Sequence, residues 1–236
     1  MLNGLRHGFH LGFSPSQKLK SAKKNKLSAA LHPSVVDQYL ANEVSLGRVA
    51  GPFSVPPYPN LHVSSFGVIP KRGQPGKWRL IVDLSSPGGE GGGASVNDGI
   101  DLDKFTLHYI TVDQVIRLVS KLGPGAHMAK FDVEAAYHNV PVHPSHCILL
   151  DLVLPFGLRS APFIFNSIAN MEWILLNSYQ IPDLLHYLDN FITAGPAQSL
   201  QRTEFGYCSG GVSTAWSTVA FWQVCGPLYS ARCLGY

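Results

Sequence analysis

A chain of 236 residues that is 45% hydrophobic and 14% charged can build a hydrophobic core, which excludes a wholly disordered protein. A formal net charge of +3 does not by itself indicate a partner. No apolar run approaches the ~20 residues that span a bilayer, and residues 1–13 lack the layout of a signal peptide. We therefore expect an intracellular protein, in the cytoplasm or nucleus, with no membrane partner.

Six basic residues precede the first acidic residue, Asp37, in a segment rich in glycine, serine and lysine. They are Arg6, Lys18, Lys20, Lys23, Lys24 and Lys26. Because no sustained hydrophobic period runs through residues 1–33, we expect a basic flexible arm there. Such a run is more often a solvated arm than a contact for an anionic polymer, and both interpretations stay open.

Two helices are indicated by their end signals. The first is expected over residues 34–46, because Gly47 supplies a stop at its C-terminus. The second is expected over residues 111–122, where Thr111 and Gln114 have the spacing of a capping box. An apolar stripe runs along the second helix, so we interpret it as structural.

A β-hairpin is expected between these helices. Residues 62–69 and 78–84 are rich in β-branched and aromatic side chains, which favour strands. The turn between them is basic and holds Lys71 and Arg72, and Arg79 follows on the returning strand. This turn is either an ordinary solvated hairpin tip or a basic lid over phosphate groups.

The next segment predicts two strands and a helix. Residues 126–133 predict a strand that delivers Asp132, and residues 147–154 predict another. A turn with proline and glycine then leads into a long helix over residues 160–179. Ser160 is suited to cap the N-terminus of that helix.

Residues 184–194 consist of two apolar runs around Asp189 and Asn190. Both residue types tolerate left-handed backbone conformations, so the pattern predicts a tight hairpin with this pair as its turn. One interpretation is an ordinary turn. The other is a carboxylate at a hairpin tip that joins Asp132, since two carboxylates at strand ends suit a magnesium site for phosphoryl transfer.

Several segments together resemble a known family. Phe-Asp-Val-Glu-Ala-Ala-Tyr at 131–137, Leu-Pro-Phe-Gly-Leu-Arg-Ser-Ala-Pro at 154–162 and Tyr-Leu-Asp-Asn at 187–190 stand in the order of motifs A, B and C of reverse transcriptases. Residues 66–71 and 77–84 resemble the fingers segment of the same family. The chain thus resembles the reverse-transcriptase domain of a retrotransposon. Such a domain is an RNA-directed DNA polymerase, and the transposable elements that this chain resembles most are the DIRS-like group.

The resemblance covers residues 34–196 and implies an α+β fold. This fold would hold a polymerase palm, with an antiparallel sheet backed by helices, and fingers, but no thumb. The implied activity is template-directed DNA synthesis, in which a primer 3′-hydroxyl attacks the α-phosphate of a nucleotide. The implied cofactor is Mg²⁺, as two ions, or Mn²⁺. The implied partners are a primed RNA or DNA template and deoxynucleoside triphosphates.

The resemblance also implies two sets of site residues. The metal ligands are Asp132, Asp189 and Asn190, and the two aspartates are the catalytic carboxylates. The nucleotide-binding residues are Lys71, Arg72, Arg79, Tyr137, Phe156 and Gly157. In this scheme Tyr137 is the steric gate against a ribose 2′-hydroxyl, and Arg79 contacts the triphosphate together with Lys71 or Arg72.

Three departures from the family pattern keep a second hypothesis open. Asn190 replaces the second aspartate of motif C, and the connection between Asp132 and Phe156 is short. Residues 197–236 form a divergent tail in which Arg232 is the one charged residue after Glu204. The chain is therefore either an impaired polymerase or a truncated, degenerate and catalytically dead remnant that acts at most as a nucleic-acid-binding module.

Overall fold

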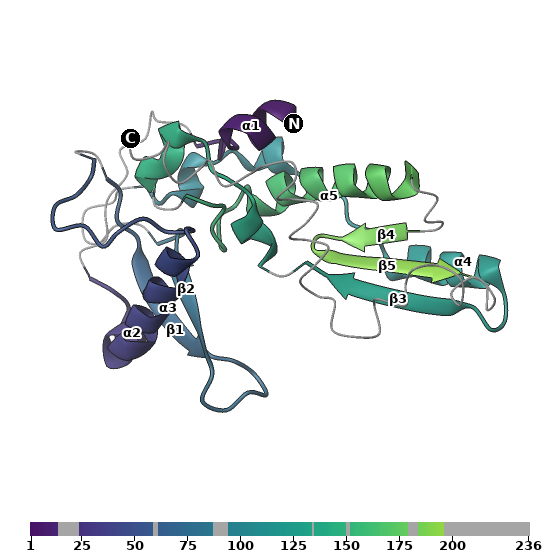
Figure 1. Ribbon diagram of the computed structural model, residues 1–236, viewed down its shortest axis with the longest axis horizontal. Helices are drawn as coiled ribbons and strands as arrows, with labels where there is room; N and C mark the ends of the chain where they lie inside the picture. The colour runs from purple at the N-terminus through teal and green to yellow at the C-terminus, as the bar shows by residue number, and fades with distance from the viewer. Residues whose placement is uncertain are drawn as a thin grey trace. The chain divides into compact units, whose positions relative to one another are not determined.

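The computed structural model describes residues 1–13, 24–58, 61–86, 94–133, 135–149, 152–178 and 184–195. These residues form two compact units, each built from separate stretches of the chain. The sheet unit holds described residues 106–133, 135–136, 162–178 and 184–195. The hairpin unit holds described residues 2–13, 24–58, 61–86, 94–105, 137–149 and 152–161. Helices combine with small antiparallel sheets in an α+β fold, as predicted (Figure 1).

The sheet unit is built on three antiparallel strands in the order β3-β5-β4. The strands are β3 (His127–Asp132), β4 (Leu184–Tyr187) and β5 (Asn190–Gly195). Phe191 and Thr193 alternate with less buried residues at the start of β5, so this central strand has one buried face. The helices of this unit are α4 (Val112–Leu122) and α5 (Ala161–Ser178).

The buried face of the sheet is tied to α5 through His186 of β4. Its ring stacks on Phe191 with centroids 5.3 Å apart, and its Nε2 forms a 2.9 Å hydrogen bond with Asn170 of α5. Phe191 is fully buried. Burying a phenylalanine side chain contributes roughly 2–3 kcal/mol, so this contact is a principal support of the strand register.

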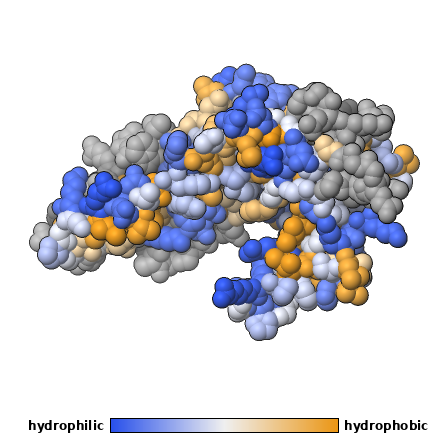
Figure 2. Space-filling view, turned by 180° about the vertical axis from the view of Figure 1, so that it is seen from behind, coloured by the Kyte–Doolittle hydropathy of each residue, from blue (hydrophilic) through white to orange (hydrophobic). Residues whose placement is uncertain are grey.

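Helix α4 begins with the predicted capping box. The Thr111 hydroxyl accepts the Gln114 N–H at 3.4 Å, and the Gln114 side chain accepts the Thr111 N–H at 2.7 Å. The predicted apolar stripe is only partly covered, since Val112 is 75% and Ile116 is 55% exposed. Hydrophobic residues also stand among hydrophilic ones on the surface shown in Figure 2. In the described part of the chain, no helix is long and apolar enough to cross a membrane.

The hairpin unit contains the predicted β-hairpin and several short helices. The strands are β1 (Ser65–Pro70) and β2 (Trp78–Asp83), paired antiparallel, and the α-helices are α1 (Leu2–His7), α2 (Leu27–Leu31) and α3 (Pro33–Ser45). The 3₁₀ helices are Asn97–Gly99, Leu102–Phe105, Ala136–Asn139 and Pro144–Leu149. A small core joins α2, α3 and the hairpin through Ala29, Val36 and Val68.

The N-terminal segment differs from the flexible arm that was predicted for residues 1–33. Residues 1–13 and 24–33 are described, and they pack against the rest of the hairpin unit rather than extending as an arm. The Phe9 N–H donates to the Pro141 carbonyl at 2.8 Å, and the Leu11 carbonyl accepts the buried Ser160 hydroxyl at 2.7 Å. Lys18, Lys20 and Lys23 lie outside the described residues.

Glycine has a packing role within this segment. A Cβ atom on Gly12 would lie 2.1 Å from the Phe105 ring, and Gly12 also has a positive φ of 73°. Glycine is therefore required at this position for close approach of the backbone, not for flexibility. From sequence alone the two uses of glycine look the same.

The strand predicted over residues 147–154 is not found in its described part. The 3₁₀ helix Pro144–Leu149 covers residues 147–149, and an isolated bridge joins Val153 to Pro141. Pro141 has no N–H to extend this pairing. Residues 150–151 lie outside the described residues. The hydroxyl of Ser160, which was predicted to cap α5, donates to the Leu11 carbonyl at 2.7 Å.

Three imidazole rings meet where the N-terminal segment packs in the hairpin unit. The His10 ring stacks on His143 at a centroid distance of 4.0 Å and meets His146 edge-on at 5.1 Å. The Leu11 N–H donates to Nδ1 of His146 at 3.1 Å, so this nitrogen must be unprotonated. Burial lowers the pKa of His143 and His146, and nearby imidazoles, those of His10 and His7 among them, lower it further.

We predict that this cluster makes the chain less stable in mild acid. Unfolded histidine binds its proton near pH 6.5, whereas folded His143 and His146 bind theirs at lower pH. Their contribution to stability is therefore present above pH ~6.5 and is lost as the pH falls toward the folded pKa values. Urea unfolding at pH 7.5 and 5.5 should show a smaller pH effect for the double variant His143→Gln/His146→Gln than for the unmodified chain. An equal change in the free energy of unfolding between the two pH values in the double variant and the unmodified chain would contradict this prediction. The control is His108→Gln, which replaces an exposed histidine.

Candidate functional site

Three residues of the Tyr-Leu-Asp-Asn and Phe-Asp segments form one row across the sheet unit. Asp132, the last residue of β3, is paired with Asn190, the first residue of β5, and Asn190 is paired in turn with Tyr187 of β4. Directly paired residues of antiparallel strands point to the same face, so these three side chains share one face of the sheet. Asp189 precedes the row in the turn, and its carbonyl accepts the Val133 N–H at 2.9 Å.

The hairpin turn is shifted by one residue from the prediction. Its two central residues are Leu188 and Asp189, and Asn190 already belongs to β5. Leu188 has a φ of 52°, a left-handed conformation that costs a leucine roughly 1–2 kcal/mol. A one-residue shift would turn Phe191 from the buried face to the opposite one, which costs more than the strained turn.

The two aspartates interact electrostatically. Burial raises the pKa of Asp132, and the negative charge of Asp189 raises it further, while Lys130 acts in the opposite direction. Asp132 is exposed and Asp189 is half-buried. A cation bound beside these two carboxylates would relieve the repulsion that Asp132 experiences from Asp189.

The donor set at this end of the sheet fits a hard dication. Carboxylate and amide oxygens are ligands that Mg²⁺ accepts, and Asp132, Asp189 and Asn190 offer both types. Among the described residues no group of three or more His, Cys, Asp or Glu side chains could hold a metal ion, and Glu134 lies outside them. The Asn190 side-chain N–H donates to a carboxylate oxygen of Asp189 at 3.0 Å. This Asp189 oxygen therefore already accepts one hydrogen bond, which leaves it fewer lone pairs for a metal ion.

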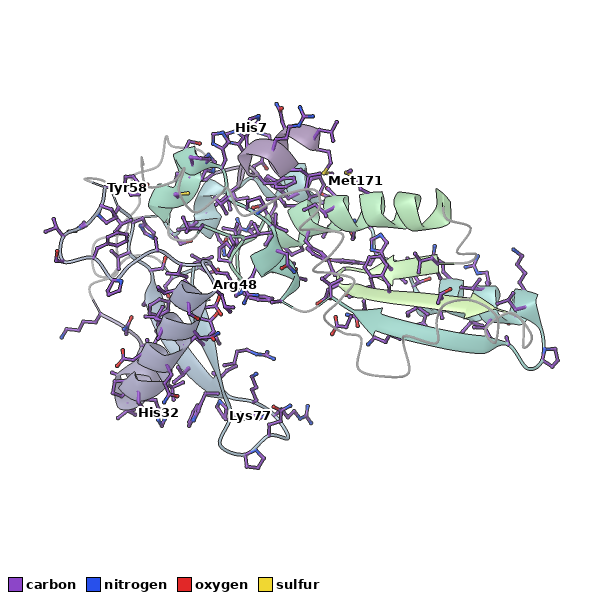
Figure 3. The ribbon with its side chains drawn as sticks, in the orientation of Figure 1. His7, His32, Arg48, Tyr58, Lys77 and Met171 are labelled. Atoms are coloured by element: carbon purple, nitrogen blue, oxygen red, sulfur yellow. The ribbon has the colours of Figure 1, made fainter. Side chains whose placement is uncertain are left out.

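The basic residues of the second predicted set lie on the β1–β2 hairpin of the hairpin unit. Lys71 and Arg72 are exposed residues of the turn, which is closed by a 2.8 Å hydrogen bond from the Lys71 N–H to the Lys77 carbonyl. Figure 3 shows Lys77 beside this turn. Arg79 is exposed on β2. Among the residues that the structure describes, no ion pair engages these three side chains, so their charges are available to an anionic ligand.

The other members of that set come together around Phe156. The Phe156 ring is 52% exposed and packs on the Tyr137 ring with centroids 4.9 Å apart. Gly157 follows with a φ of 89°, and a Cβ there would lie 3.5 Å from the Val82 carbonyl. An exposed phenylalanine ring that packs on a half-buried tyrosine beside a glycine turn offers an apolar surface on which a base or sugar could pack.

Asn97 holds this turn and was not identified from the sequence. It is buried, and its side-chain amide donates to the Gly157 carbonyl at 2.9 Å and to the Ser85 hydroxyl at 2.7 Å. Its side-chain oxygen accepts the Arg159 N–H at 2.8 Å. The residue belongs to no motif, and the sequence signal was only an asparagine in a short apolar segment.

The structure thus places the two predicted sets in different units and brings together the metal set, but only part of the nucleotide set. Asp132, Asp189 and Asn190 belong to the sheet unit. The residues of the hairpin unit are Lys71, Arg72, Arg79, Tyr137, Phe156 and Gly157. Within the hairpin unit, the basic residues and the aromatic pair lie on separate elements, the β1–β2 hairpin and the segments around Tyr137 and Phe156.

Comparisons with known proteins support the fold. No family model matches the chain, and no curated protein matches it by sequence. The chain is similar to the crystal structure of prototype foamy virus protease-reverse transcriptase, with a TM-score of 0.53 and 14% sequence identity. The match covers 81% of this chain but only 24% of that one, so the chain spans about a quarter of its neighbour. At this identity the likeness concerns the fold, which is similar to part of a retroviral reverse transcriptase.

We predict that Asn97→Ala destabilises the chain and loosens the turn around Gly157. The substitution leaves the Gly157 carbonyl and the Arg159 N–H without their partner in part-buried hydrogen bonds, which should lower the free energy of unfolding by about 1–2 kcal/mol. Urea unfolding measures the loss, and amide hydrogen exchange at Arg159 reports the turn itself. Asn97→Asp, which keeps only the acceptor, should lose the donated bonds yet retain protection of Arg159. A stability within ~0.5 kcal/mol of the unmodified chain for Asn97→Ala would contradict the assignment.

Proposed function

We propose that this chain is a reverse-transcriptase-like domain of a retrotransposon, with the β3-β5-β4 sheet as its palm and the β1–β2 hairpin as part of its fingers. The observation that carries the proposal is the meeting of Asp132 and Asp189 at adjoining strand ends. The order of the three polymerase motifs supports it. The finer assignment to DIRS-like elements rests on the motifs alone and stays a prediction.

Asp132, Asp189 and Asn190 would hold the Mg²⁺ or Mn²⁺ of this site. When bound, such ions supply activation of a primer hydroxyl and stabilisation of charge on the leaving pyrophosphate. The two aspartates contribute the charge that attracts them, and Asn190 contributes a neutral amide ligand. The repulsion that raises the pKa of Asp132 supports a cation between the carboxylates.

The nucleotide contacts are assigned to the hairpin unit. Lys71, Arg72 and Arg79 would neutralise the triphosphate of a deoxynucleotide, since their charges are free of ion pairs among the described residues. Tyr137 would exclude a ribose 2′-hydroxyl by its bulk, while Phe156 and Gly157 would line the base and sugar. A primed RNA or DNA template is the proposed macromolecular partner.

A catalytically dead remnant is the second candidate, and one contact favours it. The Asn190 amide donates to Asp189, so a carboxylate oxygen that a metal would use already accepts a hydrogen bond. Compared with the second aspartate of motif C in the family pattern, Asn190 also lacks a negative charge at the place where two dications would bind beside a triphosphate. Phosphoryl transfer depends on positioning and electrostatics, and a misplacement of about 1 Å can reduce the rate ~100-fold.

The metal assignment predicts that Asn190→Asp strengthens Mn²⁺ binding about tenfold, because a charged ligand replaces a neutral one beside two carboxylates. Asp132→Ala should abolish binding at this site. Calorimetric titration with Mn²⁺ measures both effects. Asp113→Asn, which removes an exposed carboxylate at the start of α4 in the same unit, is the matched control and should not change the affinity. Loss of affinity in Asn190→Asp would contradict the ligand set.

The catalytic assignment predicts no measurable primer extension by the unmodified chain, and no rescue by Asn190→Asp alone. The charge defect is one of three departures from the family pattern, together with the short Asp132–Phe156 connection and the divergent sequence of residues 197–236. The assay is incorporation of labelled deoxynucleotide on a primed homopolymer RNA with Mg²⁺ or Mn²⁺, with Asp132→Ala as the blank. Incorporation above that blank would favour an active minimal polymerase, and rescue by Asn190→Asp would show that charge is the main defect.

A further inference from the structure

The exposed ring of Phe156 packs on two neighbours rather than one. Tyr137 lies beside it with tilted rings, and His138 meets it edge-on with centroids 5.1 Å apart and an interplanar angle of 65°. The two neighbours are consecutive residues of the 3₁₀ helix Ala136–Asn139. The orientation of Phe156 therefore depends on how that helix is anchored.

The anchor is a buried acid from a distant part of the chain. Glu43, in α3, is 4% exposed, and its Oε2 atom lies 3.3 Å from Nδ1 of His138. Its other oxygen lies 3.6 Å from the Arg48 guanidinium. Arg48 lies beyond the C-terminal end of α3 (Figure 3), and its N–H donates to the Glu43 carbonyl at 2.9 Å. The buried carboxylate thus lies between a guanidinium counter-charge and an imidazole nitrogen.

This arrangement defines the state of the imidazole. Burial and the Arg48 charge lower the pKa of His138 to about 4, so the ring is neutral at neutral pH. A neutral imidazole carries one N–H, and an ionised carboxylate can only accept, so the 3.3 Å contact with Glu43 favours the tautomer with its N–H on Nδ1. The same contact limits the planes that the His138 ring can adopt. The plane of His138 in turn sets the edge against which Phe156 packs.

We propose that Glu43 and His138 are positioning residues of the nucleotide site. Glu43 orients the His138 ring. The His138 ring in turn holds the Phe156 ring at the angle at which it meets an incoming deoxynucleotide. This inference rests on the proposed function. It extends the site to α3, which contains no residue of the polymerase motifs. Neither residue touches the nucleotide in this scheme, and both act through Phe156.

A purely structural role for the pair is the competing explanation, and the variant His138→Asn separates the two. The asparagine amide can still donate to Glu43, so the anchor between α3 and the 3₁₀ helix is kept. The ring that contacts Phe156 is lost. A structural role therefore predicts little change, whereas a positioning role predicts a specific loss at Phe156.

The experiment is a titration of the full chain with a fluorescent deoxyadenosine triphosphate in the presence of Mg²⁺, together with thermal unfolding. His138→Asn should weaken nucleotide binding about fivefold to tenfold with little change in the unfolding temperature, because a pair of stacked or edge-on rings contributes at this level. Glu43→Gln, which keeps the size of the side chain but removes its charge, should weaken binding in the same direction. His108→Asn, at an exposed position, is the matched control and should bind as the unmodified chain does.

A second measurement keeps this inference separable from the proposed function. Without nucleotide, the NMR resonances of the Phe156 ring should shift in His138→Asn and in Glu43→Gln but not in His108→Asn. Unshifted Phe156 resonances, or nucleotide affinity unchanged in His138→Asn, would overturn the positioning role. An unmodified chain that binds no nucleotide at all would overturn the nucleotide site itself, and with it the role assigned to both residues.

Discussion

The pairing of β3 with β5 is the constraint on which the candidate site depends. These strands come from segments about sixty residues apart, and their antiparallel register sets Asp132 opposite Asn190. The hydrogen bond from Val133 to the Asp189 carbonyl continues this pairing past the strand end. This register is what brings the two aspartates close together, because Asp132 and Asp189 are far apart in the sequence.

The register is itself held by burial on the other face of the sheet. Phe191 and Thr193 face inward, and His186 ties β4 to Asn170 of α5. Since side chains alternate along a strand, burying Phe191 obliges Asn190 to face the opposite side with Asp132 and Tyr187. The strained φ of Leu188 is a consequence of the same register, so the local cost of the turn is offset by burial one residue later.

In the hairpin unit, buried polar side chains add directional contacts to an apolar core that includes Ile100, Val140 and Leu154. Asn97 makes three hydrogen bonds that hold the turn at Gly157. Glu43 is satisfied by Arg48 and His138, and the N-terminal segment is held by the Ser160 hydroxyl. Each of these groups would be costly to bury without its partners, so the contacts specify a single arrangement of the loops around Phe156.

The sequence by itself determined the elements whose signals are short-range. The α4 capping box, the β1–β2 hairpin and the apolar runs around Asp189 follow from neighbouring residues, and the motif order indicated which carboxylates to examine. Only the tertiary structure decided the packing of residues 1–13, the 3₁₀ helix in place of a strand at residues 147–149, and the partners of Asn97 and Glu43. These depend on contacts between residues far apart in the chain, and a glycine or a lone polar residue has the same local pattern whether it is exposed or meets a distant partner.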